Sequence, residues 1–192
     1  MRWLPTAVYE RRRADAQVDH LRTLATIDGL TGVYNRRYFL ALAEAEWNRS
    51  RRYHRPLALL MIDIDHFKAV NDRYGHDVGD QVIAGVAKIC MDGKRHSDVV
   101  GRMGGEEFAV LLPETSSAEA AVVAERLRIA VSMLVLPIGD PTPSVSISVG
   151  VSDARDASQI ADFLKQADLA LYEAKRTGRN RVALAKKSFA LN

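Results

Sequence analysis

Gly101-Arg102-Met103-Gly104-Gly105-Glu106-Glu107-Phe108 lies between two apolar runs, residues 99–100 before it and 108–112 at its end. Two adjacent glycines between β-prone runs indicate a hairpin turn, because both can adopt positive φ without a Cβ clash. Glycines in a turn also let a ligand lie against bare backbone. The carboxylates of Glu106 and Glu107 would then stand at the rim, where they can hold a divalent cation beside phosphates. An ordinary hairpin with solvated acids fits this stretch equally well.

Length and composition limit the class of protein around this turn. The chain has 192 residues, of which 47% are hydrophobic, and this suits one domain with a short appended element. The net charge of +3 fits an anionic ligand but is too small to indicate a nucleic-acid-binding surface. The sequence contains neither a long apolar run nor the hydrophobic core of a signal peptide. We therefore expect a cytoplasmic protein with no membrane segment and no nucleic-acid partner.

The single cysteine, Cys90, excludes an internal disulfide framework and a thiolate zinc cluster. It falls in an apolar helical pattern with Val82, Val86 and Ile89, which predicts a buried, unreactive thiol. His66 and His76 have no partner at zinc-ligand spacing. A zinc site is therefore not expected.

The N-terminal residues 1–25 form a charged segment with a thin apolar stripe. Ala14, Val18, Leu21 and Ala25 have heptad-like spacing, in a seam too short to be stable alone. This segment is either a helical stalk that pairs two copies or a solvated helix packed on its own domain. We expect the main domain to occupy residues 26–192.

The run from Leu57 to Asp65 is almost continuously apolar and predicts a central strand buried on both faces. It ends in two acids, Asp63 and Asp65. We expect their side chains to face opposite ways, so that only one lies in a site. Since a buried acid is costly unless it is paired or bound to a metal, the end of this strand is a candidate site.

Helix-capping residues mark where other elements begin. Asn35 is placed to cap a helix that ends in a basic segment, and Asp80 is expected to open another amphipathic helix. Ser116 and Glu119 have capping-box spacing, before a helix that we expect to reach Val131.

The C-terminal third predicts one strand and one helix. Residues 145–151 alternate apolar residues with Ser or Gly, which indicates a half-buried strand. The last helix is expected to stop near Gly178, with a short strand after it. A hairpin mixed with crossover helices predicts an α/β fold, an α+β sandwich of the ferredoxin-like kind with a mostly antiparallel sheet.

The segment Gly104–Phe108 resembles the GGEEF form of the signature of the GGDEF family of diguanylate cyclases. Further blocks similar to the family follow in the same order, and the resemblance covers about Thr26 to Leu184. The blocks are residues 28–37, 63–68, 71–80, 144–151 and 172–180. The resemblance implies a palm-type nucleotidyl cyclase fold whose β-hairpin carries the signature.

The reaction implied by the resemblance joins two GTP molecules into cyclic di-GMP and releases two pyrophosphates. A homodimer with one GTP in each half-site follows from the two-fold symmetry of the product. By position, Asp63 and Glu106 would hold two Mg²⁺ (or Mn²⁺) ions, helped by the carbonyl of Ile64. Glu107 would assist the metals or the attacking hydroxyl, and Asp65 would be structural.

Substrate contacts also carry over by position. The phosphates would be met by the turn glycines Gly104 and Gly105, by backbone N–H groups, and by cations. The backbone groups are those around His66 and Phe67, and the cations are Lys68, Lys175 and Arg179. Lys175 and Arg179 would share a face if the last helix persisted to Gly178.

Asn71 and Asp80 match the family's guanine contacts. A carboxylate accepts hydrogen bonds from N1–H and the 2-amino group of guanine, whereas adenine offers neither donor. Asp80 therefore favours GTP over ATP as the substrate.

Arg95 and Asp98 have the R-x-x-D spacing and resemble the family's inhibitory product site, to which Arg126 could add a contact from a second subunit. Two other functions remain open. A catalytically silent module could sense cyclic di-GMP or GTP, although it would not require Asp63, Glu106, Glu107 and Lys68. A cyclase acting on ATP is disfavoured by Asp80.

Overall fold

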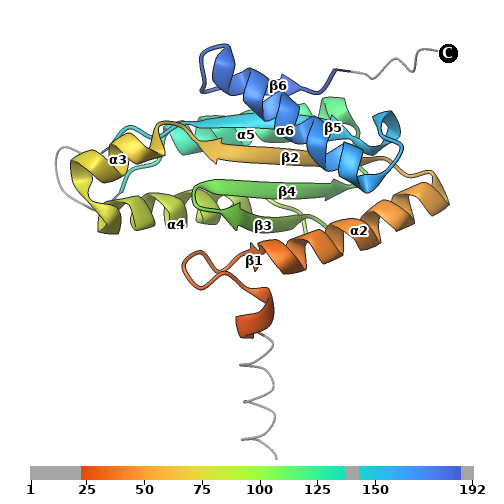
Figure 1. Ribbon diagram of the computed structural model, residues 1–192, viewed down its shortest axis with the longest axis horizontal. Coiled ribbons are helices and arrows are strands. Elements are labelled where there is room, and N and C mark those ends of the chain that lie inside the picture. The colour runs from red at the N-terminus through yellow and green to blue at the C-terminus, as the bar shows by residue number, and fades with distance from the viewer. Residues whose placement is uncertain (1–22, 137–142, 187–192) are drawn as a thin grey trace, which may run out of the picture.

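The computed structural model describes residues 23–136 and 143–186. Figure 1 shows a single sheet covered by helices. The strands are β1 (Tyr34–Asn35), β2 (Leu57–Ile64), β3 (Val99–Gly104), β4 (Glu107–Pro113), β5 (Ile147–Asp153) and β6 (Val182–Leu184). The helices are α2 (Arg36–Tyr53), α3 (Phe67–Tyr74), α4 (His76–Asp92), α5 (Ser117–Ser132), the 3₁₀ turn η1 (Ala154–Asp156) and α6 (Ile160–Arg176).

The sheet has the order β1-β3-β4-β2-β5-β6. Its four central strands pair antiparallel, with α4 and α5 as the two crossovers of a β-α-β-β-α-β unit. The short strands β1 and β6 add to the two edges in parallel. This topology confirms the ferredoxin-like, palm-type expectation.

Strand β2 is buried on both faces, as predicted. Leu60 and Ile62 contribute to a core with residues of α4 and α5, whereas Leu59 and Met61 contribute to a second core with residues of α2 and α6. Alternate side chains of one strand thus serve both layers, which explains the continuous apolar run.

Strand β5 is fully buried, so the expectation of a half-buried strand was wrong. The small residues of its pattern allow close packing and do not mark a solvated face. A Cβ on Gly150 would lie 2.2 Å from the Ala167 carbonyl oxygen, so α6 packs directly on the strand. The hydroxyl of Ser152 donates to the Phe163 carbonyl at 2.9 Å, and this satisfies its hydrogen-bonding capacity in the core.

The predicted caps of α2 and α5 are confirmed, but the start of α4 was placed too late. Asn35 accepts a hydrogen bond from the Tyr38 N–H at 3.0 Å, and Ser116 forms a complete capping box with Glu119. Helix α4 begins at His76, so Asp80 lies inside it. Gly75 adopts φ 86° between α3 and α4, a conformation that lets one helix end and the next begin at once.

Helix α6 ends at Arg176 and does not persist to Gly178, which adopts φ 128°. Arg179 follows with φ 60°, outside the helix. Lys175 and Arg179 therefore do not share a helical face. The proposed stalk lies outside the described residues except for residues 23–25. In the described ranges, no helix has the length and apolar character needed to cross a membrane.

Candidate active site

Three acidic residues lie where β2 ends and the β3–β4 hairpin turns. Asp63 pairs with Glu107, the first residue of β4, in the strand register. Glu106 lies in the turn, and its carbonyl accepts a hydrogen bond from the Ile64 N–H at 3.4 Å. Like charges directly opposite each other destabilise a strand pair. This end of the sheet therefore favours a bound cation or a basic side chain.

The hairpin predicted from the glycine pair is confirmed. Gly104 ends β3 with φ 148°, and Gly105 follows with φ 49°, both in the region where a side chain is strained. A Cβ built at either position would meet no other atom within 4 Å. The turn is therefore open on this side, as close approach of a ligand to the backbone requires.

Lys175 of α6 supplies the basic side chain. Its Nζ lies 2.7 Å from Asp63 Oδ2, and the Asp63 side chain is 9% exposed. Burial raises the pKa of Asp63, the hydrogen bond and charge of Lys175 oppose that rise, and Glu106 and Glu107 add to it. The negative charges of Glu106 and Glu107 thus act on the same Asp63 carboxylate that Lys175 neutralises.

The donor set suits a hard divalent cation that a substrate helps to bind. Within residues 23–136 and 143–186, no group of three or more His, Cys, Asp or Glu side chains is arranged to hold a metal ion. Mg²⁺ is usually held by one or two carboxylates together with substrate phosphates, not by a complete protein cage. Asp63 and Glu106, on adjoining segments, fit that requirement.

Asp65 lies just beyond β2, and its side chain has different neighbours from that of Asp63. Residues two apart on a strand lie on the same face, so the expectation of opposite faces was wrong in its reason. The Asp65 carboxylate accepts hydrogen bonds from Ser146 Oγ at 2.7 Å, Ser148 Oγ at 2.6 Å and the Asn180 N–H at 2.9 Å. It joins β2, the segment leading into β5 and the loop after α6, and it is 5% exposed.

Helices α3 and α4 place polar groups beside the end of β2 (Figure 1). His66 is the N-cap of α3 with φ 55°, and no side chain in the described part of the protein caps this helix. Its first N–H groups are therefore suited to phosphate oxygens. Lys68, in the first turn, forms an exposed ion pair with Asp72 at 2.9 Å.

The two predicted base contacts differ in their surroundings. Asn71 of α3 is half-buried, and its Oδ1 is buried without a hydrogen-bond partner in the described residues. Asp80 is exposed on α4, directly after the buried Gly79. Gly79 was not singled out from the sequence, although it lies inside the block that contains both base contacts.

A hollow of about 290 Å³ lies next to the acids and contains residues that sequence reasoning missed. Its lining comprises Arg36, Met61, Met103, Glu107, Asp168, Leu171, Tyr172 and Lys175. Partial burial and the charge of Glu107 raise the pKa of Asp168, and Arg36 opposes the rise. In the sequence, Arg36 and Asp168 lie among other charged residues of helical segments. Nothing in the sequence pattern distinguishes them from charged residues that are exposed to solvent.

The sequence pattern also does not single out Arg102, although it lies in the stretch Gly101–Phe108. Its Nε donates to the Gly105 carbonyl at 2.9 Å, and its Nη1 lies 3.1 Å from Asp28 Oδ1. Arg102 therefore braces the hairpin turn against the loop before β1. The two members of this ion pair are 74 positions apart, and only the fold brings them together.

Arg95 and Asp98 lie in the turn before β3. The Asp98 carboxylate accepts from the Arg95 N–H at 2.7 Å and is buried, whereas the Arg95 side chain is exposed. Arg126 of α5 donates to the Gly93 carbonyl of the same chain. These residues do not line the hollow beside the acids.

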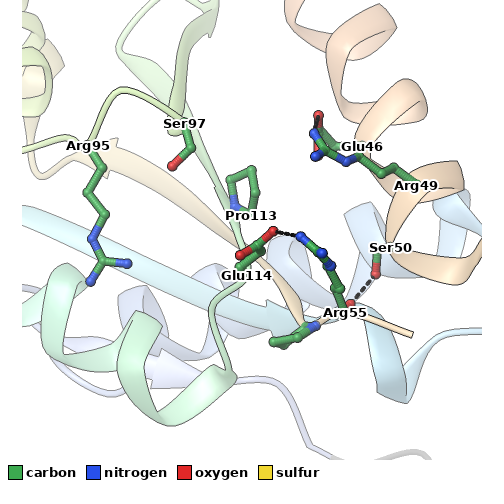
Figure 2. A pocket seen from close by; sticks show the side chains of 9 residues that line it. Glu46, Arg49, Ser50, Arg55, Arg95, Ser97, Pro113 and Glu114 are labelled. Carbon is green, nitrogen blue, oxygen red and sulfur yellow. Dashed lines mark hydrogen bonds and ion pairs between the residues drawn. The ribbon is translucent and has the colours of Figure 1, made fainter. Parts of the chain in front are cut away.

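A second hollow, of about 360 Å³, contains Arg95 and Ser97 on one side and Arg49 of α2 on the other (Figure 2). Arg55 and Glu114 form an ion pair at its edge. Three arginines and two glutamates thus line a hollow separate from the carboxylates of the hairpin, and Arg49 and Arg55 each pair with one of the glutamates.

The ferredoxin-like sheet with an acid-bearing hairpin defines a palm-type nucleotidyl cyclase domain. Residues 25–181 match the family described as "Diguanylate cyclase, GGDEF domain". The chain belongs to this family.

Similar proteins agree with the family match. A probable diguanylate cyclase, DgcC of Escherichia coli, is 44% identical over 166 residues, which cover 86% of this chain and 44% of the relative. The response regulator PleD of Caulobacter vibrioides is 39% identical, over 92% of this chain and 40% of the relative. The chain thus spans less than half the length of these two relatives.

Solved structures show the same fold. The coiled coil and GGDEF domain of DgcB from Caulobacter crescentus, in complex with c-di-GMP, has a TM-score of 0.87 and 31% identity, covering 93% of this chain and 95% of that one. The active GGEEF domain of a diguanylate cyclase from Vibrio cholerae has a TM-score of 0.75 and 37% identity, covering 80% and 98%.

Proposed function

We propose that this domain is a diguanylate cyclase that joins two GTP molecules into cyclic di-GMP and releases two pyrophosphates. The observation that carries the proposal is the pairing of Asp63 with Glu107 across β2 and β4, with Glu106 in the turn between β3 and β4. Acidic residues arranged in this way, next to Lys175 and an open glycine turn, suit a phosphate-bearing substrate with a divalent cation.

In each step a ribose 3′-oxygen of one GTP forms a bond to the α-phosphorus of the other. The bond from the α-phosphorus to the bridging oxygen breaks, pyrophosphate leaves, and the 3′-hydroxyl loses its proton. Two such steps, one in each direction, close the ring. The reaction depends on positioning and charge stabilisation and needs no covalent intermediate with the protein.

Asp63 and Glu106, with the carbonyl of Ile64, would hold Mg²⁺ or Mn²⁺ in this site. When bound, the metal supplies neutralisation of phosphate charge and a lower pKa for the 3′-hydroxyl. Glu107, opposite Asp63, is positioned to assist the metal or to accept the proton from the hydroxyl.

The remaining residues of the site bind and orient GTP. Lys175 and Lys68 meet phosphate oxygens, and the N–H groups at the start of α3, around His66 and Phe67, donate to others. Arg179 is exposed and belongs to the loop that Asp65 fixes through Asn180. Gly104 and Gly105 leave room for the phosphates against the backbone.

Guanine is recognised by Asp80 and Asn71. Because one domain binds one GTP, a second copy must present its own hairpin to complete the reaction. The domain therefore acts as a homodimer. Arg95 and Asp98, with Arg126, form the site through which cyclic di-GMP inhibits the enzyme.

The direct test incubates the purified protein with GTP and Mg²⁺ and measures cyclic di-GMP by chromatography, with Glu106→Ala as the control. Product from the wild type and none from the variant is expected. GTP binding without turnover would instead favour a silent sensor that uses Arg95 and Asp98. Equal binding of ATP and GTP would contradict the role of Asp80.

A further inference from the structure

Helix α4 contains a glycine, Gly79, that its backbone does not require. The residue is helical and buried, and its N–H donates to the Gly75 carbonyl at 3.2 Å as in an ordinary helix. Glycine weakens a helix relative to alanine. The absence of a side chain at position 79 must therefore allow a contact that a larger residue would prevent.

That contact is with Asn71. A Cβ built on Gly79 would lie 1.9 Å from Asn71 Oδ1 and 3.0 Å from Asn71 Cγ. The next neighbour, Cζ of the Phe67 ring, would be 3.1 Å away. No side chain at position 79 can coexist with the amide in its present place. Gly79 thus forms a notch in α4 that receives the end of the Asn71 side chain from α3.

Packing against α4 places the Asn71 side chain in this notch. Its Oδ1 is buried with no hydrogen-bond partner in the described ranges. The Gly75 N–H donates to the Asn71 carbonyl at 2.9 Å, and this hydrogen bond involves only the backbone. Among the described residues, no hydrogen bond to Oδ1 therefore opposes its displacement when the notch is filled.

We infer that Gly79 is a positioning residue for guanine recognition, because it lets the Asn71 amide lie beside Asp80 where the base binds. The inference rests on the proposed function. Because Oδ1 is buried in the notch, Nδ2 is the amide group left to donate to an acceptor on guanine. Filling the notch moves this amide away from the base and leaves Asp80 in place.

The test measures binding of GTP, ATP and inosine triphosphate, which lacks the 2-amino group, by calorimetry on the intact chain. The variants are Gly79→Ala, Asn71→Ala and the double variant. Gly85→Ala is the matched control, because Gly85 also lies in α4 but the nearest neighbours of a Cβ there would be the flexible ends of Leu134, at 3.0 Å, and Leu136, at 3.5 Å.

Gly79→Ala is expected to weaken GTP binding about 10-fold, the effect of one lost hydrogen bond to a ligand, and to weaken binding of inosine triphosphate by a similar factor, because hypoxanthine keeps the acceptors of guanine. In the Asn71→Ala background the same change should have no further effect. Gly85→Ala should bind all three nucleotides like the wild type. Thermal unfolding of each variant accompanies the titrations.

Unchanged GTP affinity in Gly79→Ala would overturn the inference, as would an equal loss with and without Asn71. A Gly79→Ala protein that fails to fold supports the inference if removal of Asn71 restores folding and overturns it if not. A wild type that binds no GTP, or binds GTP and ATP equally, contradicts the proposed function itself and the inference with it.

Discussion

The ammonium of Lys175 lies 2.7 Å from the carboxylate of Asp63 and joins α6 to the end of β2. Each residue of this pair is proposed to bind a different part of the ligand, the lysine a phosphate and the aspartate a cation. Without ligand they neutralise each other, so the site keeps its buried charge paired. The pair therefore stabilises the residues of the site in the ligand-free protein without blocking their proposed roles.

Asp63→Asn is expected to stabilise the metal-free protein at neutral pH while abolishing activity. The folded protein raises the pKa of Asp63 above 3.8, its ordinary value. The folded state then binds more protons than the unfolded state just above that pH, so this residue's contribution to stability falls as pH rises through its folded pKa. Urea unfolding with a chelator, at several pH values, measures the difference.

The stability gain should be absent below pH 3.8 and present above the folded pKa. A variant less stable than the wild type at neutral pH, or a difference that does not change with pH, would contradict this assignment of Asp63.

Asp65→Asn should have the opposite effect and destabilise the protein by about 2–3 kcal/mol. Its buried carboxylate accepts three hydrogen bonds, from Ser146, Ser148 and the Asn180 N–H, and an amide cannot accept all of them. Asp72→Asn, which breaks only the exposed ion pair with Lys68, is the control and should change stability by less than about 1 kcal/mol. Equal effects of the two changes would show that the Asp65 network does not hold the loop after α6.

Arg95→Ala and Asp98→Ala should separate ligand binding from stability. Arg95 is exposed and lines the hollow of Figure 2, so its loss should abolish inhibition by cyclic di-GMP with an unchanged midpoint of unfolding. Asp98 is buried and accepts from the Arg95 N–H, so its loss should also destabilise the turn by about 1–3 kcal/mol.

Rates of cyclic di-GMP formation with added product, together with thermal unfolding, check both variants. Inhibition that persists in Arg95→Ala would remove this residue from the product site.

Cys90 should not react with a thiol reagent in the folded protein. It is buried in α4, and burial raises the pKa of its thiol to about 12, so almost no thiolate forms near neutral pH. Labelling at pH 8 should therefore follow the rate of unfolding and become immediate in denaturant. Fast labelling of the native protein would mean that α4 opens locally.

Sequence patterns were sufficient where a signal is local. The glycine pair predicted the hairpin, the apolar run at 57–64 predicted β2, and Asn35 and Ser116 predicted two helix starts. Each depends on residues a few positions apart, so backbone conformation and side-chain periodicity determine it.

The features that the sequence did not predict depend on tertiary contacts. The serines of β5 suggested a solvated face, but the structure buries them against a carboxylate and a carbonyl oxygen. The braces from Arg102 to Asp28 and from Lys175 to Asp63 join segments far apart in the chain. In the sequence, Gly79 looks like any other helical glycine. Only the structure shows that Asn71 occupies the space that a side chain at position 79 would fill.

The central claim is that two copies of this domain together convert GTP into cyclic di-GMP. The most direct test measures the initial rate with Mg²⁺ over a wide range of protein concentration, with Glu106→Ala and a chelator as controls. We predict that the rate rises with the square of protein concentration when the protein is dilute. It becomes proportional to protein concentration once all of the protein is dimeric. Either control abolishes it. Absence of product at high protein concentration, with GTP still bound, would contradict the claim.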